Sequence, residues 1–381
     1  MSDPLLYQRD PNLLMEWASD EEDPAGHPVL LIDARSGRRC PWPDPSGDPE
    51  LTLRVLSRLG APTTAEELHR RWPDAPQLVR LQEVLEAAAR AGLVTVSAAR
   101  DSPHDRPGGC SPHQSAAHRE ASMVPPDIDS LPGTPPPARL PAPATPETVT
   151  RLPDPPAPAP THPFETVLAQ RRSLREFTSE PVPLHLLGTL LGRAARVRGH
   201  LSPLEHQQTQ RPSPSGGGRH SLEIYVLARS VDGLEPGVHH YDPFGHTLER
   251  RGEWDAHLEE LVDRLVTVPG RMDQAPPVSL YFASHVTRTS WKYGGMTLSL
   301  VYRDTGCLMQ TLCLTAADLG LGACPIGALE APVTAPFLAG SGSEVMHVGG
   351  MALGAPAGPA PAVVPHPGAH DEGGPSSVTA V

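Results

Sequence analysis

A proline-rich stretch divides this chain into parts that must fold separately. From Pro135 to Pro160 the sequence reads PPPARLPAPATPETVTRLPDPPAPAP, and the residues before it also offer little apolar surface. Proline lacks a backbone donor, and so few apolar groups cannot offset the entropy lost on ordering. We therefore predict a flexible or partly extended linker over residues 98–160 and a similar flexible tail over residues 357–381.

Length, charge and cysteine usage narrow the class of protein. A chain of 381 residues favours two domains, and a formal net charge of −13 disfavours nucleic acid or an anionic membrane as partner. No segment approaches the roughly 20 apolar residues of a membrane span, and the N-terminus lacks the pattern of a signal peptide. The five cysteines are scattered without a CxxC pair, which argues against a disulfide framework and a zinc site. We expect a soluble cytoplasmic protein with reduced thiols and no metal.

Residues 1–97 are predicted to form a small domain. A strand is expected at residues 29–33, followed by three helices and a further strand, and Thr64 with Glu67 forms a capping box at the start of the second helix. This order resembles a winged helix, a fold that commonly binds DNA. Because acidic residues are mixed with the arginines of the third helix, docking of a peptide or partner protein is favoured over DNA, and a purely structural role also stays open.

Residues 161–356 read as a second, mixed domain. Strands are predicted at residues 222–228, 278–284 and 345–354, and helices at residues 184–196, 254–265 and 306–320. The last helix is nearly all apolar, so it should be buried in a core or a subunit interface. The fold class is therefore α+β.

Three short motifs in this domain carry the chemistry. Arginine presents fixed bidentate donors that suit a phosphate, and glycine lets a backbone approach a flat ligand closely. Each motif alone is also compatible with an ordinary turn, a flexible loop or a helix cap. The first motif is Arg171, Arg172, Ser173 and Arg175; the second is Pro212, Ser213, Ser215, Gly216, Gly217 and Gly218; the third contains Gly320, Gly322 and Gly327.

In combination these residues resemble the nitroreductase-like flavoprotein fold and, more narrowly, its SagB-type azoline dehydrogenases of ribosomal-peptide natural-product pathways. The matching pieces cover most of residues 163–356 and read RRSLREF, RPSPSGGGRHSLEIYVLA, GLEPGVHHYDPFGHTL, SWKYGGMTLSLVYRDTGCLMQTLCLTAADLGLGACPIGA and HVGGMALGAP. The resemblance implies a homodimer with FMN at the subunit interface. It assigns the arginine motif to the FMN phosphate and ribityl chain, and the Pro212 to Gly218 loop to the isoalloxazine, with Pro325, Ile326 and Gly327 against the flavin as well.

The same resemblance gives a role to SWKYGGM, in which Lys292 and Tyr293 stand side by side. By itself the dipeptide is equally an ordinary turn with a solvated lysine. In the SagB-type branch such a pair is the catalytic motif, so Lys292 and Tyr293 become the candidates for handling the proton while FMN takes the hydride. Which of the two is the base stays open.

The leading hypothesis is an FMN-dependent dehydrogenase that converts thiazolines or oxazolines in a ribosomally made precursor peptide to azoles, as in azole-peptide or thiopeptide biosynthesis. Its N-terminal domain would bind the leader peptide or a partner cyclodehydratase. The alternatives are a generic NAD(P)H-dependent nitroreductase or flavin reductase, and a non-catalytic peptide-binding scaffold. The chain departs from many SagB-type relatives at Cys307 and near Thr311, where an effect on packing is expected, and it lacks a basic residue after the last strand.

Overall fold

The computed structural model describes residues 4–10, 13–17, 29–33, 39–41, 48–98, 133–140, 149–155, 162–202, 207–339 and 345–358. They belong to two compact units, one built mainly from residues 1–126 and the other mainly from residues 127–381. None of the helices within these ranges is both long and apolar enough to cross a membrane. Beyond residue 358, the predicted tail lies outside the described residues.

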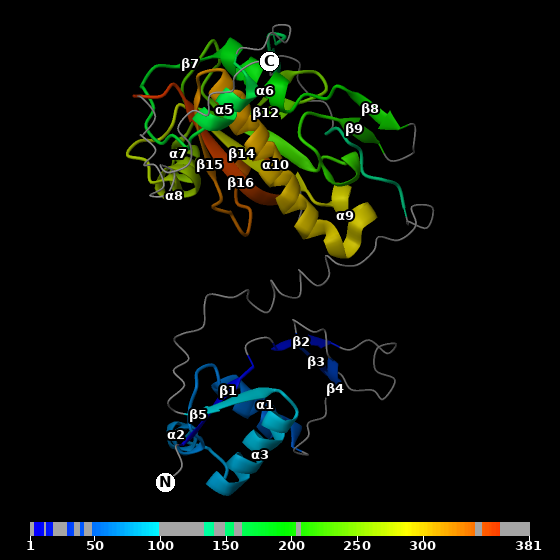
Figure 1. Ribbon diagram of the computed structural model, residues 1–381, viewed down its shortest axis with the longest axis vertical. Coiled ribbons are helices and arrows are strands. Elements are labelled where there is room, and N and C mark those ends of the chain that lie inside the picture. The colour runs from blue at the N-terminus through cyan, green and yellow to red at the C-terminus, as the bar shows by residue number, and fades with distance from the viewer. Residues whose placement is uncertain are drawn as a thin grey trace, which may run out of the picture. The chain divides into compact units, whose positions relative to one another are not determined.

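The first unit contains the three predicted helices and the strand that follows them (Figure 1). The Thr64 hydroxyl accepts a hydrogen bond from the Glu67 backbone N–H at 3.1 Å, as the capping box predicts. Leucine and valine side chains of α3 close the core together with Trp72. The elements are β1 (Leu5–Arg9), β2 (Leu13–Trp17), β3 (Val29–Asp33), β4 (Arg39–Pro41), α1 (Pro49–Arg58), α2 (Ala65–Arg71), α3 (Leu78–Arg90) and β5 (Val94–Ala98); β1 pairs with β5, and β2, β3 and β4 form a separate sheet.

The second unit is organised around a seven-stranded antiparallel sheet in the order β15-β16-β14-β10-β12-β13-β6 (Figure 1). The α+β fold class is confirmed. The strands of this unit are β6 (Val149–Arg151), β7 (Val182–Pro183), β8 (Gly199–Ser202), β9 (Gln208–Gln210), β10 (Leu222–Ala228), β11 (Val231–Asp232), β12 (Gly237–Asp242), β13 (Thr247–Glu253), β14 (Val278–His285), β15 (Gly322–Ile326) and β16 (Val345–Gly354). The helices are α5 (Phe164–Gln170), α6 (Leu184–Ala194), η4 (Gly216–Gly218), α7 (Ala256–Val262), η5 (Asp263–Thr267), α8 (Val268–Gly270), α9 (Thr287–Tyr293), η6 (Gly294–Met296), α10 (Thr297–Asp318) and η7 (Pro336–Leu338).

Both faces of this sheet are buried. Along β10 the side chains alternate: Ile224 and Val226 join a core that includes leucines of α6 and α10, whereas Tyr225 and Leu227 join a second core that includes leucines of α7. This alternation follows from the two-residue repeat of an extended strand. Because helices cover both faces of the sheet, every residue of β10 is buried, and Glu223 is its single charged residue.

The apolar helix predicted over residues 306–320 is confirmed as part of α10, which begins earlier, at Thr297. The sequence pattern missed the first turns because they carry polar side chains and follow two glycines. Cys307 and Thr311 lie on this helix, where the Thr311 hydroxyl donates to the Cys307 carbonyl at 2.8 Å.

A flexible or partly extended linker is predicted over residues 98–160, and flexibility is wrong for two of its segments. Residues 149–151 form β6, which extends the large sheet by pairing with β13. Residues 133–140 are also held by the second unit, with Ala138 only 1% exposed. Composition misled here because the partners that order these prolines come from distant parts of the chain. The other residues of this stretch, apart from Ala98 at the end of β5 and residues 152–155, lie outside the described ranges.

Candidate functional site

The predicted glycine loop connects β9 to β10. Gly217 and Gly218 have φ angles of +59° and +64°, in the left-handed region that glycine adopts without strain. A Cβ atom on Gly217 would lie 2.5 Å from the Tyr293 hydroxyl oxygen. The loop therefore needs glycine both for its backbone angle and for its close contact with Tyr293.

A carboxylate that the sequence reasoning missed holds this loop. Asp304, which is 6% exposed on α10, accepts hydrogen bonds from the Ser215 hydroxyl at 2.5 Å and from the Gly216 backbone N–H at 3.1 Å. Burial raises the pKa of Asp304, and the two hydrogen bonds oppose that shift. The available signal was an isolated aspartate on a largely apolar helix.

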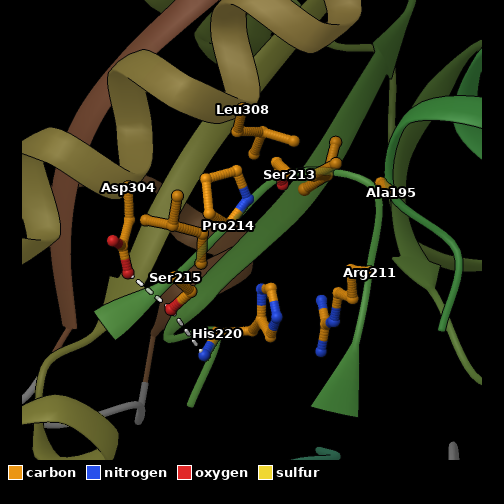
Figure 2. A pocket seen from close by; sticks show the side chains of 10 residues that line it. Ala195, Arg211, Ser213, Pro214, Ser215, His220, Asp304 and Leu308 are labelled. Carbon is orange, nitrogen blue, oxygen red and sulfur yellow. Dashed lines mark hydrogen bonds between the residues drawn. The ribbon is translucent and has the colours of Figure 1, made fainter. Parts of the chain in front are cut away.

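The inner side of the loop borders a cavity of about 20 Å³, room for about one water molecule. Figure 2 shows Ser215 between Asp304 and the backbone nitrogen of His220, with Arg211 nearby. Burial lowers the pKa of His220 to about 3 and that of Arg211 to about 10. At neutral pH the His220 imidazole is therefore uncharged and Arg211 is positively charged, and Arg211 Nη2 is buried with no hydrogen-bond partner in the described part of the chain.

Lys292 and Tyr293 lie at the end of α9 and not in a turn, and both are half-buried. The Lys292 Nζ atom is 5.4 Å from the centroid of the Tyr293 ring. Since Tyr293 also packs against Gly217, the structure brings the predicted catalytic pair and the predicted glycine loop together.

The arginine motif follows α5 and runs beside β15. Ser173 forms a parallel bridge with Ala323, and the Leu174 N–H donates to the Ala323 carbonyl at 3.0 Å. The guanidinium groups are partly used by the fold: Arg172 Nη1 donates to two nearby carbonyls, while Arg175 Nε donates to Gly270 O at 2.9 Å. Arg172 Nε is buried and has no hydrogen-bond partner among the described residues.

The same edge of the sheet carries the third predicted group. Pro325 and Ile326 lie on β15, and Gly327 follows it, where an added Cβ atom would meet nothing within 4 Å. Among the described residues, no hydrogen bond or ion pair joins this edge to the glycine loop.

The two parts of the predicted site lie at different points along α10. Asp304 holds the loop, whereas Cys313 lies near enough to Arg171 for the guanidinium to oppose the burial that raises the pKa of the Cys313 thiol to about 11. Nine residues of helix separate them, about 13 Å at 1.5 Å per residue. The described residues contain no cluster of three or more His, Cys, Asp or Glu that could hold a metal.

Comparison with known proteins identifies the family. A sequence profile described as the nitroreductase family matches residues 168–355. A protein of Methanocaldococcus jannaschii that carries the name of a nitroreductase is 33% identical over 168 residues, which cover 43% of this chain and 78% of that protein. The chain belongs to the nitroreductase family. This confirms the broader part of the resemblance, an oxidoreductase family whose members typically bind flavin.

Solved structures of nitroreductase-family members are similar as well. A structure from Ralstonia eutropha that bears the name nitroreductase is 25% identical, with 58% of this chain and 95% of that chain covered and a TM-score of 0.44. One from Desulfovibrio desulfuricans, in complex with FMN, is 15% identical, with coverage of 56% and 99% and a TM-score of 0.33. The E. coli microcin synthetase McbBCD complex, with truncated pro-MccB17 bound, is 16% identical, with coverage of 81% and 94% and a TM-score of 0.36.

The contact at Gly217 predicts the effect of adding one methyl group. Gly217→Ala would place a Cβ atom against Tyr293 and force a left-handed backbone on alanine, so the free energy of unfolding should fall by about 1–3 kcal/mol. Urea unfolding measures this loss. Gly252→Ala, where the added Cβ atom meets nothing within 4 Å, is the matched control; equal losses in both variants would contradict the packing argument.

The buried carboxylate predicts a second loss. Asp304→Ala removes the acceptor for Ser215 and Gly216, so this nitroreductase-family domain should lose about 1–3 kcal/mol of unfolding free energy. Arg303→Ala, at an exposed neighbour on the same helix, should unfold like the parent protein in the same urea titration. A parent-like Asp304→Ala would show that Asp304 does not hold the loop.

The depressed pKa of His220 predicts an acid sensitivity. The unfolded chain takes up a proton at this histidine near pH 6.5, whereas the folded chain does so only near pH 3, so its stabilising contribution is complete above pH 6.5 and lost as the pH falls toward 3. Relative to His220→Gln, the parent should lose about 1.4 kcal/mol per pH unit within this window. Urea unfolding at several pH values tests the slope. The exposed His257→Gln serves as control, and parallel curves for parent and His220→Gln would refute the assignment.

Proposed function

We propose that this chain is an FMN-dependent azoline dehydrogenase of the SagB type, acting on thiazoline or oxazoline rings in a ribosomally made precursor peptide. The observation that carries the proposal is the place of Lys292: it adjoins Tyr293, which packs against the glycine loop beside β10. A generic nitroreductase needs no such pair. The product would be a thiazole or oxazole of an azole peptide or thiopeptide.

Lys292 is the single lysine among the 31 lysine and arginine residues of the chain. The other 30 of these residues are arginines, whose guanidinium groups stay protonated in proteins. A lysine amine, by contrast, can release and accept a proton. A lysine kept at this one position is what a proton-transfer role requires. The composition thus supports the assignment independently of the resemblance.

The residues present fit FMN. The buried Arg172 Nε has no acceptor among the described residues, and a phosphate oxygen would supply one beside Arg171 and Ser173. Gly327 faces open space at the end of β15, which leaves room for a flat ring. In this proposal the arginine motif binds the phosphate and ribityl chain. Residues 212–217 and 325–327 border the isoalloxazine.

The chain's own task is to orient the azoline and to move one proton. Aromatisation breaks two C–H bonds of the ring and forms a double bond; one hydrogen leaves as a proton to Lys292 Nζ or the Tyr293 oxygen, and the other leaves as a hydride. Bound FMN would supply the redox chemistry by accepting that hydride, with dioxygen as the final oxidant. The half-buried position of the pair limits competition from water.

A second copy of the chain is proposed to complete each site, because the arginine motif beside β15 and the glycine loop occupy different parts of one chain.

The first unit is proposed to dock the leader peptide or a partner cyclodehydratase. On α3, Arg80 pairs with Glu83 at 3.0 Å and Arg90 with Glu86 at 3.7 Å, which leaves little positive charge for phosphates. The exposed Val79 on the same helix is an apolar contact that a peptide could use.

The proposal predicts that an amine is needed at position 292. Lys292→Arg and Lys292→Ala should bind FMN like the parent, measured by visible absorption, but oxidise an azoline peptide about 10²–10⁴-fold more slowly. The loss of two hydrogens from the peptide is followed by mass spectrometry. Tyr293→Phe tests which of the two residues is the base, since a base at Tyr293 would make this variant as slow as Lys292→Ala.

A single lysine also allows a direct observation. Protein with labelled lysine has one side-chain resonance, and the azoline peptide should shift it, whereas an azole product peptide should shift it less. Full activity of Lys292→Arg would overturn the proposed base. Rapid reduction of the bound flavin by NADPH with no azoline oxidation would favour a generic nitroreductase, and a protein that takes up no flavin would favour a scaffold.

A further inference from the structure

A short segment of the predicted linker is bound along the second unit. We name Pro135–Arg139 the strap; Figure 1 shows this part of the chain in teal near β9. The Ala138 N–H donates to the Gln207 side-chain oxygen at 3.0 Å, and the methyl group is buried. Arg139 pairs with Asp242, and its guanidinium lies 5.6 Å from the ring centroid of Phe244.

Two buried arginines bind the carbonyl groups of the strap. Arg219 Nη2 donates to Pro136 O at 2.7 Å, and Arg288 Nε donates to Pro137 O at 2.9 Å. Both residues are buried, with whole-residue exposures of 0% for Arg219 and 2% for Arg288. Consecutive prolines suit this role because their carbonyls are not engaged in helix or sheet and their extended form loses little entropy on binding. Without the strap, both cations would lose an acceptor.

The same two arginines hold the helix that carries the proposed catalytic pair. Arg288 lies in the first turn of α9, and Arg219 Nε donates to the Arg288 carbonyl at 3.0 Å. Lys292 is four residues after Arg288, one turn further along the helix. Trp291 directly precedes Lys292, and the centroid of its ring lies 5.9 Å from the Arg219 guanidinium carbon. A continuous set of contacts therefore leads from the strap to Lys292.

We propose that the strap is a positioning element of the active site, an internal peptide ligand that holds α9 and thereby the orientation of Lys292 and Tyr293. The inference rests on the proposed function for the role of that pair, but not for the effect on α9. The second unit binds the strap through three features: the carbonyls of its consecutive prolines, the small buried side chain of Ala138, and the positive charge of Arg139.

Ala138→Trp tests this inference, because a large side chain cannot occupy the buried position of Ala138. Hydrogen exchange of the full-length protein should be at least about fivefold faster at the α9 amides, since the helix loses interactions of two buried arginines. Thr134→Trp, at the exposed residue just before the strap, is the matched control and should exchange like the parent. Arg139→Ala, which removes the pair with Asp242, should change α9 in the same direction by a smaller factor.

A peptide added in trans separates positioning from general damage. The octapeptide GTPPPARL should restore slow exchange of α9 in Ala138→Trp, while the same peptide with tryptophan in place of its buried alanine should not. Unchanged α9 exchange in both Ala138→Trp and Arg139→Ala, with faster exchange of the strap itself, would overturn the proposal. So would fast exchange that the octapeptide fails to reverse.

Turnover distinguishes this inference from the proposed function. If both hold, Ala138→Trp lowers kcat for an azoline peptide with little change in KM, and the octapeptide recovers kcat. If the parent protein oxidises no azoline but α9 still responds to the strap, the proposed function fails and the positioning role stands. If azoline oxidation is normal in Ala138→Trp, the positioning role fails alone.

Discussion

The second unit depends on a buried ion pair between Glu223 and Arg288. Arg288 Nη1 donates to Glu223 Oε1 at 2.5 Å, and both side chains are 3% exposed. Burial alone would raise the pKa of Glu223, but Arg288 and His240 outweigh it and hold that pKa at about 2. Removing one partner would leave an uncompensated buried charge, which costs far more than the pair itself contributes.

This pair connects elements that are distant in sequence. Glu223 is on the central strand β10, His240 on the neighbouring β12 and Glu249 on β13, and His240 bridges the two carboxylates at 2.8 and 3.2 Å. Burial lowers the pKa of His240, but the hydrogen bonds with both carboxylates raise it to about 9, so His240 is positively charged at neutral pH. Arg251 also pairs with Glu249, at 2.7 Å. The network thus fixes α9 to the sheet.

Two elements hold the residues of the proposed chemistry in place: the ion-pair network fixes α9, and α10 fixes the glycine loop. Asp304 of α10 holds the glycine loop in the position where Gly217 meets Tyr293, while the ion-pair network and the strap hold α9. Membership of the nitroreductase family accounts for an oxidoreductase activity and for flavin binding. Under the proposed function, the single lysine at position 292 would serve as the proton acceptor.

The sequence alone determined the features that depend on local order and short spacing. The strand at residues 222–228, the capped helix after Thr64 and the apolar part of α10 follow from periodicity, capping and composition, and each is present. The resemblance to the nitroreductase family rested on short motifs, and the family match bears it out. Only the tertiary structure decided which groups meet. Asp304 under the glycine loop, Glu223 with Arg288, and the docked prolines of the strap each join residues more than 60 positions apart. Such pairs leave no periodic signal, because a buried charge or a proline carbonyl finds its partner through the fold and not along the chain.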